Sequence, residues 1–146
     1  MIKRQAEELG AIPINYREED VVGKVMELTG GRGAPAVLEC AGTSQSIRQA
    51  CLAAAKGGVI SAIGIPHSEP SLPLKRMVLD EVELVGNRAN PNTAEEAIGL
   101  LENGLIDLTP LLTHRYPLKD YATALDIYEN RTDGAIKVAT KPNGME

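Results

Sequence analysis

Three short segments, each following an apolar run, contain the residues that are best suited by type and spacing to contact a ligand. They are Cys40-Ala41-Gly42, Ile63-Gly64-Ile65 and Gly86-Asn87-Arg88. If the apolar runs are parallel strands, these segments lie beyond the carboxyl ends of the strands, where open parallel sheets bind ligands. Small residues there leave backbone N–H and C=O groups open to a bound molecule. The alternative, which the residues alone favour, is that these glycines only end the strands tightly.

The other reactive side chains form no recognisable catalytic or metal-binding pattern. A metal site needs several ligands, such as two His one turn apart or paired Cys-x-x-Cys, and neither spacing occurs. Structural or solvent-exposed roles are therefore expected for His67 and His114. Cys40 and Cys51 are expected to be buried, inert thiols. No Ser-His-Asp or Cys-His set stands out, so no catalytic and no metal-binding residue is assigned.

Composition excludes several classes of partner. The chain has 146 residues, one domain's worth, and a net charge of −5 with its 15 basic residues scattered, which argues against nucleic-acid binding. No apolar run approaches the roughly 20 residues of a membrane span, and no apolar segment follows Met1–Arg4 as in a signal peptide. Two cysteines fit a reducing compartment, so a cytoplasmic location is expected.

Helix and strand periods alternate along the chain. Because short connections join them, the pattern predicts an α/β fold, a parallel sheet with helices on its faces. Near-continuous apolar strands indicate that both faces are covered. Ser44 is predicted to be the N-cap of the third helix. The residues beyond Asn87 are predicted to form a distinct tail of the domain. Strands are predicted at 12–16, 36–40, 59–63, 83–85, 113–116 and 135–140, and helices at 3–11, 18–29, 45–55, 75–79, 93–103 and 118–128.

The order and spacing of several segments resemble the C-terminal half of the zinc-dependent medium-chain dehydrogenases, the alcohol, polyol and threonine dehydrogenase group. Each segment alone is weakly specific, but together they cover almost the whole chain. They are Leu9-Gly10-Ala11, Asn15-Tyr16, Val37–Gly42, Gly57-Gly58-Val59, Gly64-Ile65-Pro66, Leu84–Arg88, Thr113–Leu118 and Gly134–Val138.

The resemblance implies a partial Rossmann-type sheet with flanking helices. Residues 1–110 would form a partial dinucleotide-binding domain. Residues 111–146 would be a C-terminal helix-strand return segment, which in the family packs on the catalytic domain. The family's zinc-binding catalytic domain, Gly-rich turn and acidic ribose-binding residue would lie upstream of Met1, so a truncated dehydrogenase is expected. The choice of substrate, and of NAD or NADP, depends on those missing parts.

The same resemblance implies that the three glycine-containing segments line the nicotinamide half of an NAD or NADP site. Small residues would let the backbone approach the ring, and exposed N–H and C=O groups would hold its carboxamide. Lys137 would lie against the pyrophosphate as a point charge. Zinc belongs to the parent family, but this chain offers no recognisable ligands for it.

The reaction implied for the complete enzyme is NAD(P)-linked hydride transfer from an alcohol or polyol, with zinc polarising the alcohol oxygen. This chain alone is expected to be inactive and to bind NAD weakly at best. Two alternatives stay open. The chain could be a non-catalytic nucleotide-binding or scaffold module, or one half of a split dehydrogenase completed by another chain.

Two expectations concern assembly. A right-handed crossover through the helix at 18–29 predicts that the strand at 12–16 lies beside the strand at 36–40, which gives four strands in chain order. In the family, subunits pair at the sheet edge that corresponds to Ser71-Leu72-Pro73-Leu74. A homodimer through Leu72 and Leu74 is therefore expected, with no nucleic-acid or membrane partner.

Overall fold

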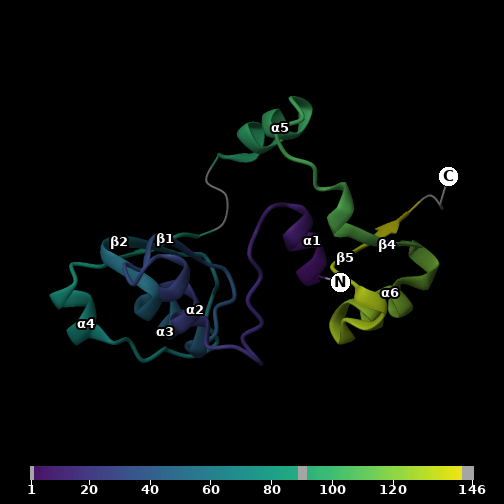
Figure 1. Ribbon diagram of the computed structural model, residues 1–146. Helices are drawn as coiled ribbons and strands as arrows, with labels where there is room; N and C mark the ends of the chain where they lie inside the picture. The colour runs from purple at the N-terminus through teal and green to yellow at the C-terminus, as the bar shows by residue number, and fades with distance from the viewer. Residues whose placement is uncertain (1, 89–91, 143–146) are drawn as a thin grey trace. The chain divides into compact units, whose positions relative to one another are not determined.

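The computed structural model describes residues 2–88 and 92–142, which belong to two compact units (Figure 1). One unit is Ile14–Pro91, and the other combines Met1–Pro13 with Asn92–Glu146. Met1 and residues 143–146, at the ends of the two expected domains, lie outside the described residues. The expected boundary near residue 110 rests on family roles and stays a prediction.

The sheet of the Ile14–Pro91 unit has three described strands, β1 (Ala34–Glu39), β2 (Ala54–Ala62) and β3 (Glu83–Gly86). They are parallel and lie in chain order, β1-β2-β3. The α/β class and the order of these three predicted strands are confirmed. β2 begins earlier than expected, since it follows the preceding helix without a loop.

Three helices accompany this sheet: α2 (Val21–Leu28), α3 (Ser44–Ala53) and α4 (Leu74–Leu79). α3 packs against β1 and β2, and α2 packs against α3 (Figure 1). The N-cap of α3 is Thr43 rather than the predicted Ser44. Thr43 can cap because its extended backbone turns its hydroxyl toward the first free N–H groups of the helix.

The strand expected at 12–16 does not form, because residues 11–15 adopt no regular structure. Pro13 has no N–H to give to a ladder, and a strand without a partner leaves its remaining groups unpaired. The expected four-stranded order was therefore wrong in its first strand. Among the described residues no strand pairs with the other edge of β1, which we call its free edge, and a groove of about 490 Å³ runs beside it between β1, α2 and α3.

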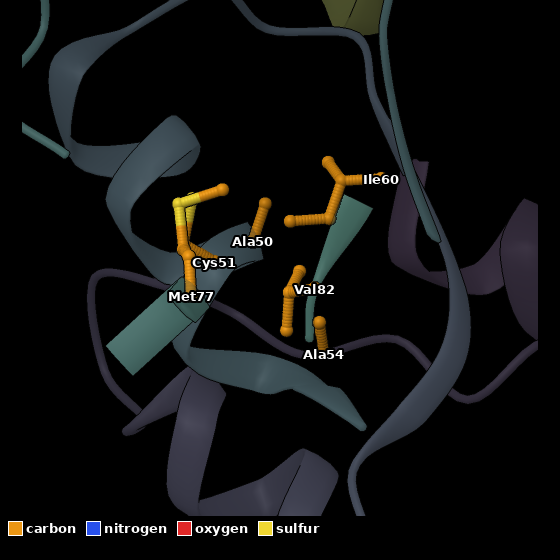
Figure 2. Close-up of a cluster of buried hydrophobic side chains, with 6 residues drawn as sticks. All are labelled: Ala50, Cys51, Ala54, Ile60, Met77 and Val82. Carbon is orange, nitrogen blue, oxygen red and sulfur yellow. The ribbon is translucent and has the colours of Figure 1, made fainter. Parts of the chain in front are cut away.

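A small apolar cluster on one face of the sheet is the core of this unit. Figure 2 shows its side chains, which come from α3, β2, α4 and the residue before β3. Ile60 and Cys51 are its largest fully buried members. Val37 of β1 packs against the cluster. The six buried residues are Ala50, Cys51, Ala54, Ile60, Met77 and Val82.

The opposite face of the sheet is open. Leu38 is 72% exposed and Val59 is 39% exposed, whereas Val37 and Ile60, one position along each strand, face the core. Successive side chains of a strand point to opposite faces, so this alternation means that helices cover one face. The expectation that both faces are covered was wrong for this unit.

The other unit contains a two-stranded parallel sheet. β4 (Leu112–Pro117) pairs with β5 (Lys137–Lys141), and α6 (Tyr121–Asn130) packs against both strands. Gln5 Nε2 donates a hydrogen bond of 2.9 Å to the carbonyl oxygen of Pro110. The remaining helices of this unit are α1 (Ile2–Glu8), α5 (Ala94–Glu102) and the short 3₁₀ turns η1 (Thr109–Leu111), η2 (Leu118–Asp120) and η3 (Thr132–Gly134). None of the helices in the described part of the chain is long and apolar enough to cross a membrane.

Candidate functional site

The carboxyl ends of β1, β2 and β3 lie level with one another. Glu39 aligns with Ala62 in the first pair of strands, and Ala62 aligns with Gly86 in the second. The three predicted segments begin at or directly after this row, so the structure brings nine of the ten predicted site residues to one edge of one sheet. We call residues 40–42, 63–65 and 86–88 the first, second and third loops.

The first and second loops touch through their glycines. Gly42 is buried with φ +65°, and a Cβ atom there would lie 2.7 Å from the carbonyl oxygen of Ile65. A Cβ atom on Gly64 would overlap the backbone nitrogen of Gly42. Only glycine allows so close an approach of two backbones at these positions. The loops therefore form one surface rather than two separate strand ends.

Glu39, a residue not assigned to the site from the sequence, holds these two loops. Its side chain is buried, and its Oε1 accepts hydrogen bonds from the N–H groups of Ala41 (2.9 Å) and Gly42 (3.0 Å) and from the Ser46 hydroxyl (2.7 Å). Its carbonyl oxygen accepts from the N–H groups of Ile63 (2.8 Å) and Gly64 (2.9 Å). The sequence feature that points to this role is that Glu39 is the single charged residue in the apolar segment 36–40.

The third loop is tied to β2. The Asn87 N–H donates to the carbonyl oxygen of Ala62 at 2.8 Å, and Asn87 Nδ2 donates to the Ser61 hydroxyl at 2.8 Å and to the Val85 carbonyl at 3.2 Å. Arg88 is exposed beside it. The third loop is thus bonded to β2, whereas the first and second loops are both bonded to Glu39 at the end of β1.

The loops present apolar and backbone surface to solvent. Ile65 is 80% exposed and Ile63 is 44% exposed, and a Cβ atom on Gly86 would meet nothing within 4 Å. Exposed apolar side chains beside accessible backbone groups are typical of a surface that another molecule covers. Next to the first loop, a hollow of about 430 Å³ is lined by Ile14, Tyr16, Val21, Ala41, Thr43, Gln45, Ser46 and Gln49.

The two cysteines differ, which corrects the expectation that both are buried. Cys40 is exposed, since it follows β1 at the free edge of the sheet. Cys51 is fully buried in the core cluster. Burial raises the pKa of the Cys51 thiol, because the uncharged form is favoured away from water. Cys51 is thus buried, as expected.

Lys137, the tenth predicted residue, belongs to the other unit. It is exposed at the start of β5 and helps to line a hollow of about 220 Å³ with residues of α6, including Tyr121 and Tyr128. Its predicted contact with a pyrophosphate stays a prediction.

Over residues 2–88 and 92–142, no three or more His, Cys, Asp or Glu side chains come together as metal ligands. His67 is exposed. The Nδ1 atom of His114 lies 2.9 Å from the Thr113 hydroxyl, and its ring stacks on Tyr116 with centroids 6.4 Å apart. These residues do not fit a catalytic zinc, and no zinc-dependent step is assigned to them.

Comparison with known proteins places these features in context. The family model described as zinc-binding dehydrogenase matches residues 3–103. An alcohol dehydrogenase of Cupriavidus necator is 35% identical over 143 aligned residues, and the match covers 94% of this chain and 39% of that protein. An L-arabinitol 4-dehydrogenase of Hypocrea jecorina is 35% identical over 127 residues, covering 87% of this chain and 34% of that protein.

A solved structure agrees with the fold. A putative zinc-binding dehydrogenase from Sinorhizobium meliloti 1021, bound to NADP, superposes with a TM-score of 0.82 at 25% identity. The superposition covers 96% of this chain and 42% of that one. The chain thus spans roughly two fifths or less of each of these relatives.

Proposed function

Because the chain belongs to the zinc-binding dehydrogenase family, we propose that its three loops form the nicotinamide-facing part of an NAD(P) site in an alcohol or polyol dehydrogenase. The observation that carries this proposal is the single surface built from the carboxyl ends of β1, β2 and β3. Ligands of open parallel sheets bind at such ends.

The fit of the residues to a nicotinamide supports the proposal. Gly42 and Gly64 let the first two loops pack into one surface, and Gly86 leaves its backbone open to a flat ring. Ile63 and Ile65 supply apolar area that a ring can cover. When bound, NAD(P) supplies the hydride acceptor or donor. The role of this chain is to orient the ring and keep water from one side of it.

We propose that binding by this chain alone is weak and that it does not catalyse alcohol oxidation alone. A dinucleotide pyrophosphate is normally held at a Gly-x-Gly-x-x-Gly turn before a helix, and this sequence contains none. No described residue is assigned the zinc chemistry of the family or the choice of alcohol.

Titration of the chain with NADH, followed by the backbone amide resonances of the loops, tests this function. We expect the amides of Ala41, Gly42, Gly64 and Asn87 to shift, with a dissociation constant of about 1 mM. The reason is that the loss of two or three charge-assisted hydrogen bonds raises a micromolar dissociation constant by several orders of magnitude. Unchanged loop resonances would overturn the proposal. A micromolar constant, or steady turnover of short alcohols with added zinc, would overturn the proposed weakness and inactivity.

The free edge of β1 supports a second candidate, in which this chain is one half of a split dehydrogenase. The groove beside that edge is lined by Val21 and Val25 of α2 and by Val37, Leu38 and other residues of β1 and α3. A strand from another chain could pair there. Co-expression with a protein that carries the part of the relatives not spanned here should then give a co-purifying complex with dehydrogenase activity. Separate elution of the two chains would count against it.

We also propose a homodimer, through the family's pairing edge. Leu72 and Leu74 are 37% and 64% exposed, and they line a hollow of about 630 Å³ together with Leu79. An apolar patch repeated on two copies is suited to a two-fold interface.

A further inference from the structure

We propose that Glu39 is a positioning residue, which holds the first and second loops in the conformation that receives the nicotinamide ring. This inference rests on the proposed function and deepens it, since it assigns a role to a residue outside the surface that touches the ligand. The observation that carries it is that Glu39 is bonded to both loops. Its buried side-chain carboxylate accepts hydrogen bonds from the first loop, and its main-chain carbonyl oxygen accepts hydrogen bonds from the second.

The side chain of Glu39 fixes the first loop. It is 4% exposed, and its Oε1 accepts from Ala41 N–H, Gly42 N–H and the Ser46 hydroxyl, at 2.9, 3.0 and 2.7 Å. Its Oε2 also lies 3.2 Å from the Gly42 nitrogen. The loop and the first turn of α3 are therefore bound to one carboxylate, and the Gly42 N–H is turned inward.

The main chain of Glu39 fixes the second loop at the same place. One carbonyl oxygen accepts from both Ile63 N–H and Gly64 N–H, at 2.8 and 2.9 Å. A Cβ atom on Gly64 would also lie 2.8 Å from Glu39 Oε2. Displacement of Glu39 would therefore move both loops together.

The described partners of the buried Glu39 carboxylate are all N–H and O–H groups. In the described part of the chain, no Lys, Arg or His nitrogen forms an ion pair with Glu39. Burying a carboxylate without a cation is costly, and hydrogen bonds from N–H and O–H groups must offset that cost. An apolar side chain at the end of β1 would avoid that cost, but it would leave the N–H groups of Ala41 and Gly42 without this acceptor. The carboxylate is explained by what it holds, a loop whose backbone has to stay in one conformation.

Rigid loops bind better, because less conformational freedom is lost when the ligand arrives. Glu39→Gln keeps the size of the side chain and one oxygen acceptor. The new amide can lie in two orientations. With its NH₂ group at the position of Oε2, that group faces the Gly42 N–H. With its NH₂ group at the position of Oε1, the acceptor of the hydrogen bonds from Ala41, Gly42 and Ser46 is lost. Both orientations put a donor against a donor, so we expect the first loop to loosen while the fold remains.

The experiment uses the whole 146-residue chain. Its amide resonances are followed during titration with nicotinamide mononucleotide, with AMP as the ligand without a nicotinamide ring. We expect nicotinamide mononucleotide to shift the Gly42 and Gly64 amides in the wild type and to bind Glu39→Gln about tenfold more weakly. AMP should leave these two amides unshifted. Amide exchange at Ala41 and Gly42 should be about tenfold faster in the variant.

A matched control separates positioning from stability. Arg76→Gln alters the far end of α3, where Arg76 binds the carbonyl oxygens of Leu52 and Ala54. This control should lower the stability of the chain yet bind nicotinamide mononucleotide with unchanged affinity. If Glu39→Gln fails to fold, Ser46→Ala removes one of the donors to Glu39, and we expect a smaller loss of affinity, about threefold.

The outcomes distinguish the two proposals. Normal wild-type binding with unchanged affinity in Glu39→Gln would overturn the role of Glu39 alone. Unchanged amide exchange at Ala41 and Gly42 would also overturn it, whatever the binding result. Absence of any loop response to nicotinamide mononucleotide in the wild type would overturn the proposed function, and with it the functional part of this inference.

Discussion

At the scale of single residues, backbone contact between strand ends defines the candidate site. Gly42 and Gly64 meet where any Cβ atom would overlap the neighbouring loop. Gly86, by contrast, ends β3 with no atom within 4 Å of a Cβ position. The glycines of the three loops therefore have different roles, since two allow close packing and the third leaves backbone accessible.

Gly64→Ala is expected to destabilise the Ile14–Pro91 unit by about 2 kcal/mol or more, because the new methyl group meets backbone that cannot move aside cheaply. Urea unfolding followed by circular dichroism measures the change. Gly86→Ala is the matched control, and its effect should stay within about 0.5 kcal/mol. Equal effects of the two substitutions would contradict the close contact between the first and second loops.

At the scale of elements, α3 is fixed at both ends and in this way links the loops to the core. At its N-terminus the Thr43 hydroxyl accepts from the Ser46 N–H, and the Ser46 hydroxyl accepts from the Thr43 N–H, which is a capping box. At its C-terminus the Arg76 guanidinium of α4 donates to the carbonyl oxygens of Leu52 and Ala54. Leu52 lies in the last turn of α3, where carbonyl groups have no partner within the helix, and Ala54 is its C-cap.

Arg76→Gln should cost about 2 kcal/mol of stability, because it removes hydrogen bonds from a cation to carbonyl groups at a helix end. It also removes the ion pair of Arg76 with Asp80, whose N···O distance is 3.1 Å. Chemical unfolding measures the difference. Lys75→Gln, an exposed neighbour in the same helix, is expected to change stability little. A loss no larger than that of Lys75→Gln would show that water replaces Arg76 without cost.

At the scale of the whole molecule, many large apolar side chains of the described residues are exposed rather than buried in the core. Leu38, Ile65, Leu74 and Leu79 are each at least 64% exposed. They lie on the open sheet face, in the second loop and in α4, which are all candidate interaction surfaces. The relatives are two to three times as long as the part that this chain spans.

The proposed homodimer makes a direct prediction. Leu72→Lys together with Leu74→Lys should convert a dimer into a monomer, because four charges would face one another across a two-fold axis. Sedimentation velocity over a range of concentrations measures the change. Leu105→Lys, at a side chain that is 71% exposed outside this patch, should leave the dimer intact. A wild-type chain that sediments as a monomer at high concentration would refute the proposal.

The sequence by itself determined most of the elements and the row of strand ends. β1, β2 and β3 were predictable because their apolar runs are local patterns bounded by glycine and proline. The three loops were predictable as one edge because parallel strands in chain order must end on the same side. The family followed from motifs spread along the chain, and its model matches residues 3–103.

Only the tertiary structure decided which groups find partners. The segment at 12–16 has an extended, apolar pattern, yet a strand needs a neighbour, and Pro13 removes a donor. The exposure of Cys40 depends on the free edge of β1, which no local pattern reveals. Glu39 looked like one residue of an apolar strand, but its buried carboxylate is bonded to Ala41, Gly42 and Ser46. The reason is the same in each case: hydrogen-bond pairing and burial depend on residues brought together by folding, whereas periodicity depends only on the residues next in the chain.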